Sequence, residues 1–465
     1  MAVFGVLIGV RDGFPLHLVS DGREKILSCL SRLGHEVVLP DKDDTYMGGI
    51  RDIADVEVYV KTFRENSERL DGLIITLPTF GDEGALSEVV RLSELNVPIL
   101  IHASKDLPEL LGADERGGAY CGKISLCNNL YQNSIPFTNT TKHVCDIDSD
   151  VFVSDIERFA AICAVVKSLR KCRLGAIGAR PAVFNTLRYS EKLLLKSGIY
   201  TVTEDFSMII GEAENIDQQE IIDEEIGRIF DYADIPKTIS STVIDKIARI
   251  NIALKEWISK NRIDAAGVLC WNSPEQFFGC TPCLGMAMLT SQGIPCACEM
   301  DILSAVSMLV LQRATGGFPI CQDWYAEYCE NAGVCIHCSS FSKECFKNKP
   351  EIGAQFVKAR TFGEDRCMGA LKGELRTGPI TFLKVTTDDK NGKIKAVLGE
   401  GKMIDGEVKT YSPYAICQIE HMEKLLDYIC KNGFEHHFTL VAGHVKDIIK
   451  EALEVYMGWD VFVHE

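Results

Sequence analysis

The chain has 465 residues, of which 46% are apolar and 25% charged, and these proportions exclude a disordered or fibrous protein. Its length exceeds the about 100 to 200 residues of a single domain and predicts roughly three domains. The formal net charge of -17 disfavours binding to nucleic acid or to an anionic membrane, because both require a basic surface.

The opening segment MAVFGVLIGVRDGFP has no basic residues before its apolar run. It therefore predicts a strand and a loop, not an export signal. No segment of the chain reaches the roughly 18 to 20 uninterrupted apolar residues that a bilayer-spanning helix requires. We expect a cytoplasmic protein with no membrane partner.

The first part of the chain alternates between strand and helix patterns. An apolar strand at 3–10 is followed by a helical pattern at 23–34 and a second strand at 35–40. The same order recurs between residues 70 and 104. Such βαβ units predict a parallel sheet covered by helices, and we assign this Rossmann-like domain to residues 1–148.

A second α/β series follows a polar segment. A long helix at 154–170 leads to a strand and glycine loop at 173–181, and further strands are predicted at 264–271 and 294–301. The glycines do not form the G-x-G-x-x-G pattern, so the sequence gives little support to nucleotide binding. We assign a second Rossmann-like parallel-sheet domain to residues 149–316.

The last part of the chain is rich in β-strand patterns. Apolar runs at 369–389 and 390–404 flank Asn391-Gly392, a strong hairpin signal. We expect residues 317–465 to form a smaller, mostly antiparallel and barrel-like domain. The predicted fold class is therefore α/β, with two parallel-sheet domains followed by a β-rich C-terminal domain.

Three carboxylates stand among apolar residues in the segment CEMDILSAVSMLVLQRATGGFPICQD. Glu299 and Asp301 follow a predicted strand, and Asp323 follows the predicted helix at 302–314. Carboxylates in apolar surroundings need a cation or a hydrogen-bond partner to offset their desolvation. Asp301 precedes the helix and suits its N-cap, whereas Glu299 suits metal binding or catalysis better.

Two histidines are candidates to complete a metal site. His337 lies between apolar residues and thiols in VCIHC, where a single histidine is more often a core residue than a ligand. His444 lies in a glycine loop between a predicted strand and a helix, a frequent place for functional side chains. Together with the carboxylates they form a ligand set that Mn²⁺ or another divalent cation accepts.

Such a site suits the isomerisation of a 2-hydroxy-aldehyde. A bound cation can chelate the carbonyl and the neighbouring hydroxyl, and carboxylates can move the protons.

The nineteen cysteines leave another interpretation open. Two C-x-x-C pairs, Cys280 with Cys283 and Cys335 with Cys338, could bind zinc or an iron-sulfur cluster. Their separation exceeds the about 15 to 20 residues of a zinc ribbon, which weakens that interpretation. A nonenzymatic sugar-binding protein is a further alternative, because two α/β domains flanking a cleft also describe that class.

The acidic segment and the AGHV loop resemble those of the L-fucose and L-arabinose isomerases. The spacing between Glu299 and Asp323 is similar to that of the two acidic metal ligands in L-fucose isomerases, and AGHV is similar to their histidine loop. The resemblance covers nearly the whole chain in plan, since those enzymes have two Rossmann-like domains and a β-rich C-terminal domain.

The resemblance implies a role for each candidate residue. Glu299, Asp323 and His444 become Mn²⁺ ligands, the two acids also transfer protons, and His337 joins the metal shell. The GVRDGFP loop resembles one that reaches a neighbouring subunit, which makes Arg11 a candidate sugar contact. The implied assembly is a homo-oligomer, a trimer or hexamer, with active sites shared between chains.

The implied reaction is the isomerisation of a free aldose to a ketose through an ene-diol. Members of this family and similar proteins act on L-fucose, D-arabinose, L-arabinose or a sulfonated hexose such as sulfoquinovose. The residues that contact the sugar elsewhere in the family are not recognisable in this sequence, so the substrate stays open among these sugars.

Overall fold

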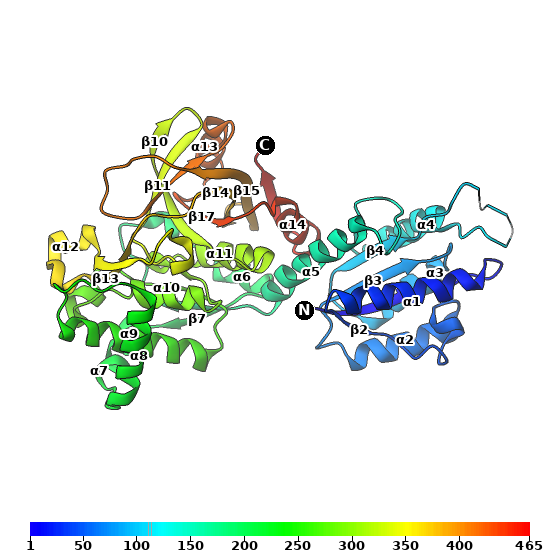
Figure 1. The fold of residues 1–465 in the computed structure, drawn as a ribbon, viewed down its shortest axis with the longest axis horizontal. Coiled ribbons are helices and arrows are strands. Elements are labelled where there is room, and N and C mark those ends of the chain that lie inside the picture. The colour runs from blue at the N-terminus through cyan, green and yellow to red at the C-terminus, as the bar shows by residue number, and fades with distance from the viewer. Residues whose placement is uncertain (110, 113) are drawn as a thin grey trace. The chain divides into compact units, whose positions relative to one another are not determined.

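The computed structural model describes residues 1–109, 111–112 and 114–465, which divide into two compact units (Figure 1). Unit 1 comprises Met1–Lys167 and Val455–Gly458, and unit 2 comprises Ser168–Glu454 and Trp459–Glu465. Most of the chain predicted to form the second and third domains thus lies in unit 2. The division into 1–148, 149–316 and 317–465 stays a prediction.

Unit 1 is built on a five-stranded sheet in the order β2-β1-β3-β4-β5, in which all neighbouring strands are parallel. Its elements are β1 (Val3–Ile8), α1 (Leu16–Arg32), β2 (Glu36–Val38), α2 (Ile53–Glu65), β3 (Gly72–Leu77), α3 (Glu83–Ser93), β4 (Ile99–Ala103), α4 (Ala119–Gln132), β5 (Thr138–Asn139) and most of α5 (Asp150–Arg170). This sheet confirms the predicted βαβ units.

Both faces of this sheet are covered by helices, because its strands are apolar on both sides. Along β3, Leu73 and Ile75 pack in one core cluster with residues of α2, α3 and α4. Ile74, which points to the opposite face, packs in another cluster with residues of α1 and α5. Because helices cover both faces, loops that follow the strands, such as the one carrying Arg11, gather at the carboxyl ends of the strands.

Unit 2 contains a second parallel sheet, of four strands in the order β7-β6-β8-β9. Its elements are β6 (Arg173–Ile177), α6 (Glu191–Lys196), β7 (Tyr200–Glu204), α7 (Phe206–Glu214), α8 (Gln219–Tyr232), α9 (Ser241–Asn261), β8 (Ala265–Val268), α10 (Cys283–Ser291), β9 (Cys296–Ala297) and α11 (Ile302–Thr315). This sheet confirms the second predicted α/β series.

The rest of unit 2 forms an antiparallel barrel. Its strands are β10 (Ile320–Cys329), β11 (Ala332–Ile336), β14 (Gly378–Asp388), β15 (Lys393–Ile404), β16 (Tyr414–Gln418), β17 (His437–Ala442) and the appended β18 (Asp460–Val463). The order β14-β17-β10-β11-β16-β15 closes into a ring, because β14 also pairs with β15. These two strands form a hairpin whose turn ends at Gly392. Closure leaves these six strands without an open edge and confirms the predicted barrel.

Between the barrel strands, the chain also forms β12 (Glu351–Ala354), α12 (Phe356–Phe362), β13 (Met368–Lys372), α13 (Met422–Lys431) and α14 (Lys446–Glu451). Within unit 2, helix α11 packs against β8 and β9 and also against β14 and β17 of the barrel. Such a helix is buried on nearly all sides, which explains its continuous run of apolar residues. Its N-terminus is therefore held where the parallel sheet and the barrel meet.

Among the described helices, none combines the length and the apolar character that crossing a membrane requires.

Candidate metal centre

Glu299 lies at the carboxyl end of the parallel sheet in unit 2. It follows β9 directly, in the short turn Cys298–Met300, and its side chain is buried. The backbone angle φ is 60° at Glu299 and 58° at Met300, a left-handed conformation that residues other than glycine rarely adopt. Strain of this kind is found where the surrounding structure fixes a functional side chain, and here it aims the Glu299 carboxylate at the barrel.

The barrel contributes three further groups from adjacent strands. Asp323 lies on β10, opposite Ile336 of β11 on one side and opposite His437 of β17 on the other. His337 follows β11 directly. The antiparallel register therefore brings one carboxylate and two imidazoles to a single end of these strands.

Three side-chain atoms of these residues lie close to Nε2 of His437. Its Nε2 lies 3.6 Å from Oε2 of Glu299, 3.2 Å from Oδ1 of Asp323 and 3.3 Å from Nε2 of His337. The neighbouring His436 also approaches Asp323, with 3.7 Å between its Nε2 and Oδ1. The carboxylate atoms Oε2 of Glu299 and Oδ1 of Asp323 are buried and have no hydrogen-bond partner among the described residues.

Asp301 holds His437 from the other side. As predicted, it caps α11, and its side chain accepts a hydrogen bond from the backbone N–H of Ser304 at 2.9 Å. Its Oδ2 also lies 2.9 Å from Nζ of Lys384 and 2.9 Å from Nδ1 of His437. Because an ionised carboxylate can only accept, Nδ1 of His437 carries a proton, and in the neutral imidazole the lone pair of Nε2 then faces the neighbouring side-chain atoms.

The electrostatic setting of the two neighbouring carboxylates differs. Burial raises the pKa of Glu299 to about 8, since few groups nearby favour its charged form. Burial acts on Asp301 in the same direction, but the ammonium of Lys384 and the hydrogen bond from His437 outweigh it and hold the pKa of Asp301 well below its usual range. Among the described residues Glu299 has no such lysine partner; the charge of His337 favours its ionised form but does not outweigh burial.

The structure brings three of the five predicted site residues together: Glu299, Asp323 and His337. His444 is exposed in the loop after β17, whereas His437 is the first residue of that strand. Strand β17 has six residues and rises about 3.3 Å per residue. His437 begins the strand and His444 lies beyond its end, so the two histidines are at opposite ends. The position against the two carboxylates is held by His437, and the ligand role of His444 has no support from the described geometry.

A signal for His437 is present in the sequence. The pair His436-His437 begins the same predicted strand that ends before AGHV, and a strand start is as good an address for a ligand as a strand end.

Arg11, the fifth predicted site residue, belongs to unit 1. It follows β1, as predicted, and its guanidinium lies 3.1 Å from Oε2 of Glu83 and 4.5 Å from the ring centroid of Phe80. Its side chain is 39% exposed, which leaves part of the guanidinium free to contact another molecule. Its contact with a sugar stays a prediction.

Cysteine thiols lie close to the residues that could bind a metal. The Sγ atoms of Cys270 and Cys298 are 2.7 Å apart, and Cys298, Cys338 and His337 have ligand atoms within 4.8 Å of one another. Cys338 also accepts a hydrogen bond from Nε2 of Gln355. Cys298 precedes Glu299 and Cys338 follows His337 in the sequence, and Cys270 contacts Cys298, so the three thiols lie next to these site residues.

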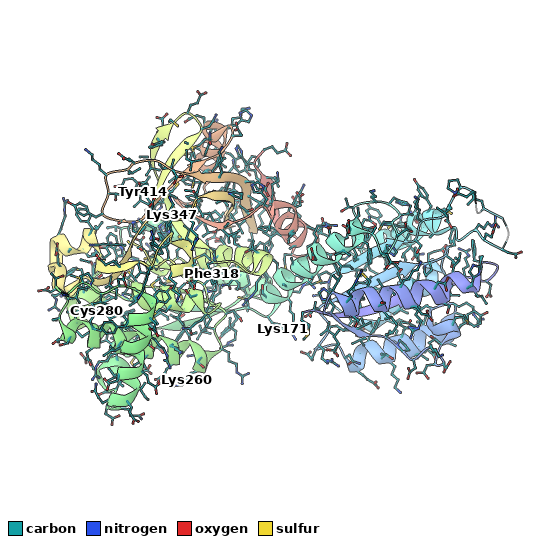
Figure 2. The ribbon with its side chains drawn as sticks, in the orientation of Figure 1. Lys171, Lys260, Cys280, Phe318, Lys347 and Tyr414 are labelled. Carbon is teal, nitrogen blue, oxygen red and sulfur yellow. The ribbon has the colours of Figure 1, made fainter. Side chains whose placement is uncertain are left out.

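This grouping differs from the predicted C-x-x-C pairs. Cys280, labelled in Figure 2, and Cys283 are buried with no exposed surface, and Cys335 is buried as well. Within the described chain, neither pair supplies two members to one potential ligand group. The interpretation as a zinc or iron-sulfur enzyme built on these pairs therefore gains no support.

Comparison with known proteins agrees with the fold. Residues 5–170 match the family described as "Fucose/sulfoquinovose isomerase, N-terminal domain", and residues 335–465 match "L-fucose isomerase, C-terminal domain". A protein of Alkalicoccus urumqiensis named sulfoquinovose isomerase is 21% identical over 401 residues, which cover 82% of this chain and 83% of that protein. A protein of the same name from Clostridium sp. (strain MSTE9) is 23% identical over 454 residues, 95% of this chain and 94% of that protein.

The two matched regions are the N-terminal and C-terminal domains of such isomerases, and the two relatives are similar to this chain along most of their length. The chain therefore belongs to the fucose/sulfoquinovose isomerase family and is an aldose-ketose isomerase.

Proposed function

We propose that this isomerase uses a hard divalent cation, Mn²⁺ by preference, held by Glu299, Asp323 and His437. His337 is a fourth donor within reach. The substrate that we propose is sulfoquinovose, the sugar named in both relatives, ahead of L-fucose, D-arabinose and L-arabinose.

One observation carries the proposal: acceptor atoms face one another in a buried space. Nε2 of His437 presents a lone pair to Oδ1 of Asp323 at 3.2 Å and to Oε2 of Glu299 at 3.6 Å. Facing acceptors repel unless a cation or a proton lies between them. Neighbouring ligands of an octahedral ion with bonds of about 2.1 Å are about 3 Å apart, so the separation between Asp323 and His437 suits a divalent cation, and Glu299 has to move closer to join them.

The donor chemistry also selects the class of cation. Carboxylate and imidazole donors suit Mn²⁺ and similar ions, whereas thiolates would favour zinc or copper. The hydrogen bond between Asp301 and Nδ1 of His437 is the outer-shell contact that orients a histidine ligand.

The residues of the site can carry out the proton transfers of the isomerisation. A bound cation would polarise the carbonyl at C1 and the hydroxyl at C2 and stabilise the ene-diolate. One carboxylate removes the proton from C2 and returns it to C1, and the other moves a proton from the C2 hydroxyl to the C1 oxygen. Either Glu299 or Asp323 can take the carbon proton, because a carboxylate oxygen of each faces Nε2 of His437.

Metal removal tests the proposed function. Protein treated with EDTA and then freed of the chelator should not convert sulfoquinovose to its ketose, and Mn²⁺ should restore the conversion. The ketose is measured by chromatography, with L-fucose, D-arabinose and L-arabinose in parallel. Full activity in protein shown to be free of metal would refute the metal-dependent mechanism, and conversion of only the unsulfonated sugars would refute the substrate.

A further inference from the structure

A second polar group at the same end of the parallel sheet has no role in the proton transfers. Lys358 of α12 has only 7% of its surface exposed. Its Nζ donates a hydrogen bond to Oδ1 of Asn272 at 2.7 Å and lies 3.4 Å from the ring centroid of Trp271. No carboxylate oxygen lies within 4.0 Å of this ammonium in the described part of the chain, so its direct contacts are with an amide and an aromatic face.

A buried ammonium without a carboxylate is costly, because burial removes its hydration. In agreement, burial is the main cause that lowers the pKa of Lys358. An anionic ligand would supply the missing partner. Glu275 is a weak ion-pair partner for this ammonium. Its carboxyl is buried without a hydrogen-bond partner among the described residues, and burial raises its pKa to about 7.

The sheet topology places this ammonium beside the proposed metal centre. Trp271 and Asn272 follow β8, Glu299 follows β9, and these two strands are parallel neighbours. Neighbouring strands are about 4.8 Å apart, so their carboxyl ends open into one region. Both Glu275 and Glu299 are near enough to act electrostatically on Lys358.

Other buried polar atoms in this region lack partners. Nε1 of Trp271 and Oγ of Ser339, which follows Cys338, have no hydrogen-bond partner among the described residues. Such atoms are what a sugar with several hydroxyl groups would satisfy, because each buried donor or acceptor needs a partner.

We infer that Lys358 is the specificity residue that binds the anionic group of the substrate, a sulfonate on carbon 6, while C1 and C2 lie at Glu299 and Asp323. This inference rests on the proposed function. An extended chain of six carbons spans about 6 Å, given carbon-carbon bonds of about 1.5 Å. The ends of β8 and β9 are one strand spacing apart, about 4.8 Å, which is within that length.

Two uncharged variants test the inference. Lys358→Met and Lys358→Gln are compared with the wild type on sulfoquinovose, on glucose 6-phosphate and on 6-deoxyglucose, which lacks the anionic group. Lys431→Met is the matched control, because Lys431 is exposed on α13 and pairs with Asp427. Metal content and thermal unfolding of each variant establish that the site and the fold are intact.

We expect kcat/KM for sulfoquinovose to fall by about tenfold to a hundredfold in both variants, mainly through KM, as for the loss of a charged hydrogen bond. The value for 6-deoxyglucose should stay within about threefold of the wild type. Equal losses on both sugars, or no loss on sulfoquinovose, would overturn the inference. A stronger loss on glucose 6-phosphate than on sulfoquinovose would assign Lys358 to a phosphate instead.

Failure of the proposed function has a different outcome. In that case the wild type loaded with Mn²⁺ would convert none of the three sugars. If both variants fail to fold, inhibition of the wild type decides the inference: the methyl glycoside of sulfoquinovose should inhibit at least about tenfold more strongly than methyl glucoside. Equal inhibition would overturn it.

Discussion

The side chain of His437 distinguishes the predicted site from the observed one. Asp301 fixes a proton on its Nδ1, and its Nε2 faces two carboxylate oxygens, Oε2 of Glu299 and Oδ1 of Asp323, that have no hydrogen-bond partner among the described residues. In this arrangement the residues have separate roles, because Asp301 orients His437 while His437 itself offers a lone pair to the cation. Glu299 and Asp323 both bind the cation and transfer protons in the proposed mechanism.

Substitutions at single residues test this division. Glu299→Gln and Asp323→Asn should each lower kcat by at least about a hundredfold, the scale of a lost general base or metal ligand. His437→Ala should do the same and weaken Mn²⁺ binding, whereas His444→Ala should stay within about threefold of the wild type. Steady-state kinetics and Mn²⁺ titration measure both effects; a large loss in His444→Ala with an active His437→Ala would restore the role predicted for His444.

At the scale of helices and strands, the sequence predicted most of the fold. Apolar runs separated by helical patterns indicated both parallel sheets, and Asn391-Gly392 indicated the β14–β15 hairpin. The helix predicted at 302–314 is α11, with Asp301 at its cap as expected.

The pairing of the barrel strands that carry the site residues could not be predicted in the same way. Asp323, Ile336 and His437 are neighbours only because β10 pairs with both β11 and β17 when the barrel closes. The separation of two residues along the chain does not predict whether they pair across neighbouring strands. The choice between two histidines at opposite ends of one strand therefore depended on a register that the sequence alone did not reveal.

Strand β4 of unit 1 allows a prediction about pH. His102 is fully buried on this strand, donates from Nε2 to the carbonyl of Cys145 and accepts at Nδ1 from the hydroxyl of Thr76. Burial lowers the pKa of His102 to about 4. Because this folded-state pKa lies below the ordinary 6.5, protonation favours the unfolded chain, and stability is lost as the pH falls below 6.5.

Urea unfolding of the full chain at pH 7.5 and 5.5 measures this loss. Its His102 component should be about 1 kcal/mol between these two values. The variant His102→Gln should be less stable at pH 7.5 but should lack that component. The same pH dependence in the wild type and the variant would contradict the assignment.

At the scale of the whole molecule, the assembly of the chains stays a prediction. Arg11 follows β1 on a loop supported by a buried strand, and its contacts with Glu83 and Phe80 hold it only partly. If Arg11 of one chain completes the site around Glu299 of another, as the family resemblance implies, two inactive variants can complement each other.

Mixing Arg11→Ala with Glu299→Gln protein under conditions of subunit exchange should then recover part of the wild-type activity, since some sites would receive both intact residues. Each variant mixed with itself is the control. No recovery, with exchange proven by mass spectrometry, would place both residues in one chain's site or remove Arg11 from it.

In the proposed mechanism, unit 2 binds a hard divalent cation between Glu299, Asp323 and His437. A crystal structure of the full chain soaked in Mn²⁺, with anomalous data on both sides of the manganese edge, tests it most directly. We predict a manganese peak in contact with Oε2 of Glu299, Oδ1 of Asp323 and Nε2 of His437. The proposed cation site would be refuted by a peak among Cys270, Cys298 and Cys338, by a peak at His444, or by no peak at saturating Mn²⁺.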